Sequence, residues 1–164
     1  MQSKVAIEKI LKHIKTVPLF HGFEENEVKE LLSIAECHTT ESGDYLIIEK
    51  QASDRAYLIM TGFVDIEIQT PDNDSATVAQ LGPGSIIGEL SLLGVKRRSA
   101  SAIAREQVIW LSWDKEPLLE YLEKDYKLAY HFMKNLCITI SSRLQNTNKE
   151  LGNAIYQALY SFSS

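Results

Sequence analysis

The spacing of apolar residues predicts helices at both ends of the chain. Residues 3–16 and 24–35 carry their apolar side chains at helical intervals, with a break between the two segments. The helical period returns at Asp114, which is placed to cap a short helix. A long helix is predicted from about residue 125. Helices therefore flank the central part of the chain.

Between residues 36 and 113 the pattern changes to short runs of β-branched and aromatic residues, separated by turn-forming residues. The runs are YLIIE, AYLIM, FVDIEIQ, ATVAQL and VIWLSW. FVDIEIQ alternates apolar and polar residues, as a strand with one buried face does. Many short strands predict a sandwich, barrel or jelly roll. We therefore divide the chain into N-terminal helices (1–35), a β core (36–113) and C-terminal helices (114–164).

A heptad pattern of apolar or small residues runs along the last predicted helix. Its members are Met133, Cys137, Ile140, Leu144, Thr147, Leu151, Ala154 and Ala158. We call this set the heptad seam. The β core could cover it, but a seam of this length more often pairs with a second copy. We therefore expect a homodimer formed through residues 133–158.

Composition narrows the class of protein. The net charge is −5, with 22 acidic against 17 basic residues, which argues against a general nucleic-acid binder. Cys37 and Cys137 form no CxxC pair, and no apolar run is long enough to span a membrane. The N-terminus is too interrupted by charge for a signal peptide. We expect a cytoplasmic protein without membrane contact.

The segment GELSLLGVKRRSAS, residues 88–101, combines one carboxylate with three consecutive cations. Glycines before Glu89 allow a tight turn that exposes backbone N–H groups, and Arg98 carries a planar donor for two phosphate oxygens. Ser99 adds a hydroxyl, and Glu89 can accept from a sugar hydroxyl. This mixture of amide, guanidinium, hydroxyl and carboxylate groups suits a ligand that carries a phosphate beside a ribose. The alternative is a surface turn whose cations are solvated.

The segment closely resembles the phosphate-binding cassette of the cyclic-nucleotide-binding domain family, Gly-Glu-Leu-x-Leu followed by Arg-(Ala/Ser/Thr)-Ala. Here residues 88–92 and 98–100 match the two parts, and we call 88–100 the cassette. VPLF, SGDYLI, DRAYLIMTGFVDI and LGPG also occur in the family's order. The resemblance implies an α+β fold: an antiparallel, jelly-roll-like β-roll with flanking N-terminal helices and a long C-terminal dimerisation helix. Within the family, RLQNTNKELGN most resembles the dimerisation helix of the catabolite activator proteins.

The resemblance also implies a role for each matching residue of the cassette. Arg98 and Ser99 would bind the cyclic phosphate with the amide of Leu90, and Glu89 would accept from the ribose 2′-hydroxyl. Gly88 would allow close backbone approach, and Ala100 completes the motif. Without a ligand, we expect the charge of Arg98 to be uncompensated. Lys96 and Arg97 have no matching role and are assigned to the solvated turn.

Three residues of the last helix complete the implied site. Thr147 would bond the adenine amino group from its own subunit, and Asn148 would approach from the partner subunit. Arg143 would reach back to Glu89. The alternative for Arg143 is a solvated helix arginine, and the alternative for Thr147 is a polar residue that sets the register of the helix pair.

Three positions depart from the family pattern. Lys50 and Gln51 replace the usual Gly-acid pair, and Ile87 replaces a frequent aromatic. We expect a remodelled turn and altered packing around the cassette.

The implied function is a non-enzymatic sensor or regulator that binds cyclic AMP, with cyclic GMP as the alternative ligand, and signals through a helix dimer. The four histidines show no metal-ligand spacing, so we expect no metal and no catalytic group. The sequence ends soon after the seam, so we expect no DNA-reading helices and no direct DNA binding, with a separate effector protein as the partner. Two alternatives remain: a structural protein with a vestigial pocket, and a truncated sensor domain of a transcription regulator.

Overall fold

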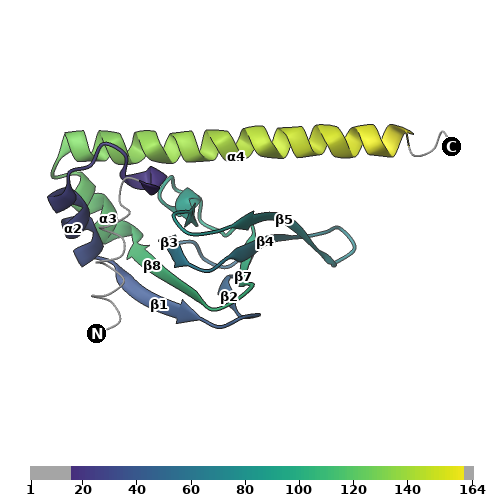
Figure 1. Ribbon diagram of the computed structural model, residues 1–164, viewed down its shortest axis with the longest axis horizontal. Helices are drawn as coiled ribbons and strands as arrows, with labels where there is room; N and C mark the ends of the chain where they lie inside the picture. Colours follow the sequence, from purple (N-terminus) through teal and green to yellow (C-terminus); the bar gives the residue numbers. More distant parts are fainter. Residues whose placement is uncertain (1–15, 161–164) are drawn as a thin grey trace.

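The computed structural model describes residues 16–160 and shows a β-roll lying beneath one long helix (Figure 1). Within this range, eight antiparallel strands form two four-stranded sheets. The first sheet has the order β1 (Glu36–Thr40), β8 (Val108–Asp114), β3 (Arg55–Thr61) and β6 (Ile86–Ile87). The second has the order β2 (Tyr45–Ile47), β7 (Ser101–Ala104), β4 (Val64–Gln69) and β5 (Ser75–Leu81).

Helices flank the roll on both sides in sequence, which confirms the predicted α+β class. They are the 3₁₀ turn η2 (Pro18–Phe20) and α2 (Glu25–Ser33) before the strands, and α3 (Lys115–Leu122) and α4 (Tyr126–Tyr160) after them. A further 3₁₀ turn, η3 (Glu89–Ser91), lies within the roll between β6 and β7. The helices predicted at 24–35 and from about 125 are therefore present as α2 and α4. The helix predicted over 3–16 lies almost wholly outside the described residues.

The largest apolar cluster joins the helices to the first sheet, with Leu31, Trp113 and Phe132 almost fully buried in it. Trp113 Nε1 donates a hydrogen bond to the Leu31 carbonyl at 2.8 Å, which fixes α2 on β8. Buried Asn135 of α4 donates to the Leu19 carbonyl at 2.9 Å and to the His21 carbonyl at 2.8 Å. The N-terminal half of α4 is thereby anchored to the domain.

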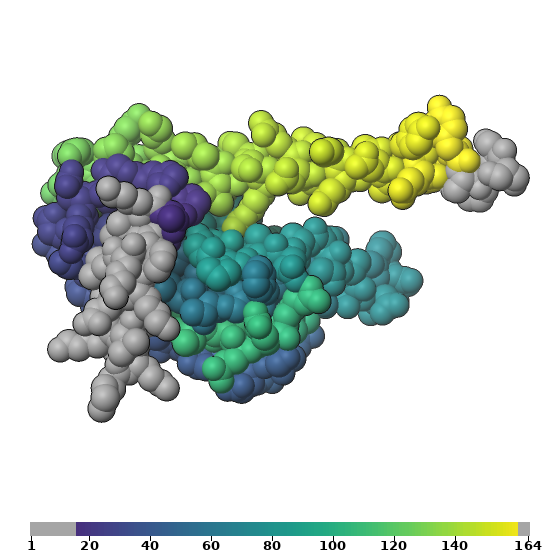
Figure 2. All heavy atoms as spheres, viewed as in Figure 1, coloured from purple at the N-terminus to yellow at the C-terminus, as the bar shows by residue number. Residues whose placement is uncertain are grey.

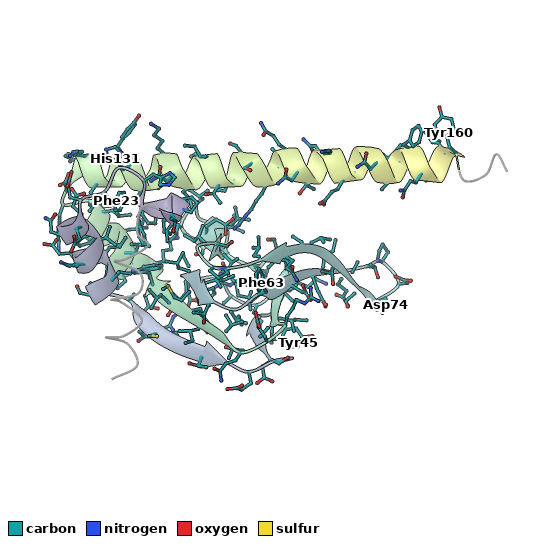
Figure 3. All side chains as sticks on the ribbon, viewed as in Figure 1. Phe23, Tyr45, Phe63, Asp74, His131 and Tyr160 are labelled. Carbon is teal, nitrogen blue, oxygen red and sulfur yellow. The ribbon has the colours of Figure 1, made fainter. Side chains whose placement is uncertain are left out.

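Beyond Arg143, α4 leaves the domain and is exposed along its length (Figure 1). The β4–β5 hairpin, with Asp74 near its tip, extends in the same direction as α4, toward Tyr160 (Figure 3). Residues of both the hairpin and α4 line the same cavity.

The heptad seam does not face a single environment. Met133 and Ile140 pack against the apolar cluster of their own domain, where α4 contacts η2 and α3, whereas Cys137 between them is exposed. Leu144 and Leu151 are 59% and 57% exposed. Because a straight α-helix has 3.6 residues per turn, a 3.5-residue pattern drifts around it and meets different neighbours along its length.

The capping hydrogen bond predicted for Asp114 is absent, although Asp114 does precede α3. Its carboxylate instead pairs with Arg55 Nε at 2.5 Å. Arg55 lies opposite Asp114 in the β3–β8 pairing, so a cross-strand ion pair takes the side chain that a helix cap would have used.

Candidate functional site

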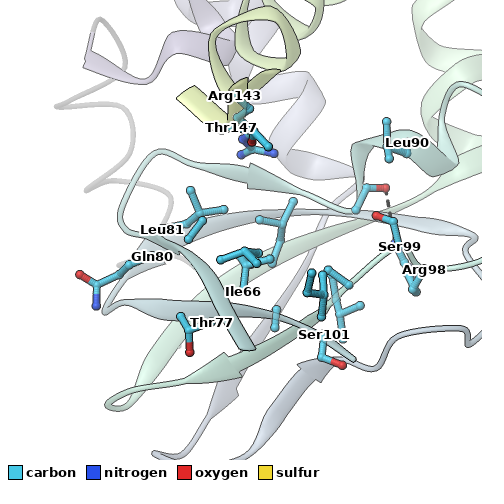
Figure 4. Close-up of a pocket in the computed structure, with 18 of the residues that line it drawn as sticks. Ile66, Thr77, Gln80, Leu81, Leu90, Arg98, Ser99, Ser101, Arg143 and Thr147 are labelled. Carbon is cyan, nitrogen blue, oxygen red and sulfur yellow. Dashed lines mark hydrogen bonds between the residues drawn. The ribbon is translucent and has the colours of Figure 1, made fainter. Parts of the chain in front are cut away.

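A cavity of about 930 Å³ lies between the β-roll and α4. Figure 2 shows the hollow between the helix and the hairpin, and in Figure 4 Arg143 and Thr147 reach into it from α4. Its walls are the β4–β5 hairpin and α4, and its inner end is formed by the cassette and the start of β7. A cavity of this size and mixed lining is typical of a site for a small molecule.

The cassette begins with a turn that only glycine accommodates well. Gly88 has φ = +70°, a left-handed conformation that side chains disfavour. A Cβ there would also meet the Arg98 guanidinium and would lie 3.0 Å from the Arg55 carbonyl. The 3₁₀ turn η3 follows at once, and Ser91 Oγ ties it back by donating to the carbonyls of Arg55 and Gly88. The predicted tight turn is therefore present.

Arg98 is buried, with 7% of its surface exposed, and its guanidinium is hydrogen-bonded without a ligand. Nη1 donates to the Arg55 carbonyl at 2.9 Å and to the Gly88 carbonyl at 3.4 Å, and Nη2 donates to the Tyr57 hydroxyl at 3.1 Å. The guanidinium carbon also lies 5.0 Å from the centre of the Tyr57 ring. Neutral oxygens, two of them backbone carbonyls that a sequence does not reveal, therefore accept hydrogen bonds from Arg98 but supply no countercharge.

Glu89 is paired with the helix that covers it. Arg143 Nη1 lies 2.6 Å from Glu89 Oε1, and Arg143 Nη2 also donates to the Ile86 carbonyl. The Glu89 side chain is only 9% exposed. The predicted contact between Glu89 and Arg143 is thus present, and Oε2 of Glu89 is left for a further donor.

Most of the residues predicted for the site line the one cavity: Gly88, Glu89, Leu90, Arg98, Ser99, Ala100, Arg143 and Thr147. Asn148 does not line it, because it follows Thr147 by one residue and so lies about 100° further around α4. Ser99 and Thr147 are exposed, so their side chains can meet a ligand without leaving other partners.

Sequence reasoning missed the apolar wall of the cavity. Its members come mainly from β2, β4, β5 and β6: Ile47, Ile66, Ile68, Val78, Leu81 and Ile87. The alternation of FVDIEIQ was a signal for Ile66 and Ile68, since it marks one face of β4. On α4, Asn146, Glu150 and Ala154 also line the cavity. These residues are spaced three or four apart from Arg143 and Thr147 or from one another, so they lie on the same face of the helix.

The loop that departs from the family pattern is bonded to the cassette. Lys50 N–H donates to the Arg98 carbonyl at 2.9 Å, and Arg98 N–H donates to the Gln51 carbonyl at 2.9 Å. Lys50 has φ = +68°, so the lysine adopts a conformation suited to glycine. Arg97 is exposed as expected, but Nη1 donates to the Lys50 carbonyl at 3.0 Å and the side chain lines the cavity. Arg97 is therefore more than a solvated turn residue, whereas Lys96 is exposed.

Other kinds of site find little support in the described range. Cys37 and Cys137 are free thiols. Among residues 16–160 no three His, Cys, Asp or Glu side chains gather as a metal site. None of the helices in that part of the chain combines the length and hydrophobicity that a bilayer span requires.

A β-roll with a glycine-led turn, a buried arginine and a helix above the pocket defines a small-molecule sensor domain. The model of the cyclic nucleotide-binding domain family matches residues 38–125, and the chain belongs to this family. It is 31% identical over 138 residues to the cyclic AMP receptor protein of Thermus thermophilus, an alignment that covers 84% of this chain and 62% of the relative. A CRP-like cAMP-activated global transcriptional regulator of Mycobacterium tuberculosis is 25% identical, with 84% and 60% covered. The chain thus spans about three fifths of the length of these curated relatives.

Solved structures give the same result. A cyclic nucleotide-binding domain from Methylobacillus flagellatus superposes with a TM-score of 0.82 at 27% identity, covering 93% of this chain and 85% of that one. The catabolite activator protein of Thermus thermophilus gives a TM-score of 0.73 at 29% identity, with 85% and 64% covered. The chain is a cyclic nucleotide-binding domain related to regulators of this type.

Proposed function

We propose that this protein is a non-enzymatic sensor that binds cyclic AMP in the cavity between the cassette and α4. The observation that carries the proposal is the buried guanidinium of Arg98 at the inner end of a cavity whose walls are largely apolar. A purine and a ribose need apolar surface, whereas a cyclic phosphate needs a charge-assisted donor. The similarity to a cyclic AMP receptor protein supports the adenine nucleotide.

The cyclic phosphate, the ribose 2′-hydroxyl and the adenine amino group each have a counterpart in the cavity. Arg98 and Ser99 bind the cyclic phosphate, with the amide of Leu90. Oε2 of Glu89 accepts from the ribose 2′-hydroxyl while Oε1 stays paired with Arg143. Thr147, which lines the cavity from α4, accepts from the adenine amino group. A ligand held in this way bridges the cassette and the helix.

The signal passes through a homodimer of α4, and the output is delivered by a separate effector. Large apolar side chains of this helix are more than half exposed and need a partner surface: Ile138, Leu144, Leu151, Ile155 and Leu159. The heptad spacing suits a second copy of the same helix, which would place Asn148 beside the partner's pocket. A ligand that contacts both cassette and helix binds one helix arrangement better than another and shifts the population toward it.

Titration calorimetry with cyclic AMP and cyclic GMP, after a thermal-shift screen that includes cyclic dinucleotides, tests the ligand. Arg98→Ala should weaken cyclic AMP binding at least about 100-fold, because it removes two charge-assisted hydrogen bonds. Lys96→Ala, which removes an exposed cation of the same turn, is the matched control and should bind as the wild type does. Unchanged affinity in Arg98→Ala would overturn the assignment of Arg98 to the phosphate. No response to any nucleotide would instead favour a vestigial pocket.

Analytical ultracentrifugation tests the dimer. Ile155→Lys places a charge among the exposed apolar residues of α4 and should produce a monomer. Asn153→Lys adds the same charge about 160° away around the helix and should leave the dimer intact. A wild-type chain that sediments as a monomer at high concentration would contradict the proposed signalling route.

A further inference from the structure

The guanidinium of Arg98 is already oriented in the absence of a ligand. Its hydrogen bonds to Arg55, Gly88 and Tyr57 occupy Nη1 and one side of Nη2. A guanidinium has five N–H donors, so Nε–H and the second Nη2–H are left for an anion. Two such donors on one edge match two oxygens of a phosphate.

Tyr57 is the only side chain, within residues 16–160, whose hydrogen bond with Arg98 holds the guanidinium in place. The other two acceptors are backbone carbonyls, which belong to β3 and to the glycine turn. Tyr57 lies on β3 with 8% of its surface exposed. Its ring therefore provides both a hydroxyl and a π face to the same guanidinium.

The Tyr57 ring is itself fixed from behind by an aromatic stack. Trp110 packs edge-on against it with ring centroids 4.9 Å apart, and His38 stacks on Trp110 at 4.3 Å. Trp110 Nε1 donates to Thr40 Oγ1 at 2.9 Å, which holds the indole in place. The stack runs through β1, β8 and β3 of the first sheet, so the position of the tyrosine is set by the sheet and not by the cassette.

We propose that Tyr57 is a positioning residue for the phosphate-binding arginine. Its hydroxyl and ring hold Arg98 with the Nε edge toward the cavity, so that binding a phosphate costs little further ordering of a long side chain. This inference rests on the proposed function, since it assigns Arg98 to the phosphate. Tyr57, which lies outside the cassette, thereby joins the residues on which the affinity for a cyclic nucleotide depends.

Burial raises the pKa of Tyr57 above the ordinary value of a tyrosine, and Arg98 opposes that shift only in part. The hydroxyl therefore stays protonated and neutral through the neutral and mildly alkaline range. Its contribution to affinity should be the same at pH 6.5 and pH 8.5.

Tyr57→Phe removes the hydroxyl and keeps the ring. Cyclic AMP affinity, measured by calorimetry, should fall roughly tenfold, because one hydrogen bond to a charged group is lost. Tyr121→Phe is the matched control: its hydroxyl bonds Glu30 on α2, away from the cavity, and its loss should leave affinity unchanged.

A second readout separates positioning from a general weakening of the fold. The Nε–H signal of Arg98 in a nitrogen-15 NMR spectrum, assigned by its loss in Arg98→Lys, should show restricted rotation of the guanidinium in the ligand-free wild type. Tyr57→Phe should release that rotation. Lower affinity with an unchanged Arg98 signal would mean a merely structural role and would overturn the inference.

The outcomes also separate this inference from the proposed function. Wild-type binding of cyclic AMP together with full affinity in Tyr57→Phe overturns the role of Tyr57 alone. A wild type that binds no cyclic nucleotide overturns the proposed function, and the role of Tyr57 in binding fails with it.

Discussion

Arg143→Ala tests whether the ion pair between α4 and the cassette holds the two together. The substitution removes the partner of Glu89 Oε1, 2.6 Å away, and the hydrogen bond to the Ile86 carbonyl. It leaves a carboxylate whose side chain is 9% exposed without its cation. The variant should therefore be less stable than the wild type, and α4 should be less firmly attached to the site.

Burial sets the magnitude of this effect. Removing one partner of a fully buried ion pair costs about 3–5 kcal/mol. Arg143 itself is 31% exposed, so water can reach Glu89 once the side chain is gone. We expect a loss of about 1–3 kcal/mol in the free energy of unfolding. The pair between Lys29 and Glu25 has a separation of 2.5 Å but is 53% and 65% exposed, so Lys29→Ala should cost clearly less stability than Arg143→Ala.

Urea unfolding followed by circular dichroism measures both variants at one protein concentration, because a dimer would make stability depend on concentration. A double-mutant cycle with Glu89→Gln isolates the pair and should give a coupling of about 1–2 kcal/mol. A coupling near zero, or equal losses in Arg143→Ala and Lys29→Ala, would refute the reasoning from burial.

Three further predictions concern stability. Lys50→Gly should stabilise the fold by about 1 kcal/mol, because φ = +68° is unfavourable for lysine. Asn73→Gly, at φ = +66°, is the control and should change stability little, since asparagine tolerates this region. A urea midpoint for Lys50→Gly at or below that of the wild type would contradict this. Asn135→Ala should cost about 2–4 kcal/mol in urea unfolding, because it removes one buried and one partly buried hydrogen bond that anchor α4. A cost below about 1 kcal/mol would show that the anchor is unimportant. Burial and the hydrogen bond with Glu30 raise the pKa of Tyr121 from 10.0 to about 12, so its neutral form is favoured in the folded state and stability should fall as pH rises between these values. Tyr121→Phe should reduce that fall, and identical alkaline unfolding curves would exclude the effect.

Strands with a clear apolar pattern could be predicted, and the others could not. AYLIM and VIWLSW correspond to β3 and β8, the central strands of the first sheet. Strand β1, ECHTT, has little apolar character because it is an edge strand that pairs only with β8. Strand β6 is two residues long and exists only through its pairing with β3. Such strands are defined by their neighbours, which a local pattern does not contain.

The sequence by itself determined the chemistry of the cassette. The types and order of Gly88, Glu89, Arg98 and Ser99 are local, and they suit a phosphate beside a sugar. The residue types alone left a solvated turn as the alternative, and the resemblance to the family favoured the binding site. The contact from Arg143 also followed from the resemblance to the family, and the folded chain contains it.

The tertiary structure alone decided how these groups are held. The carbonyl of Arg55 and the hydroxyl of Tyr57 lie more than 40 residues from Arg98 in the chain, and both reach it because β3 passes beneath the cassette. The apolar wall likewise depends on the pairing of β4 with β5, which brings Ile66 opposite Ala79. A backbone carbonyl has no sequence signature, and a pocket wall depends on which strands pair. The hydrogen bonds that hold the arginine and the shape of the cavity were therefore determined by the fold.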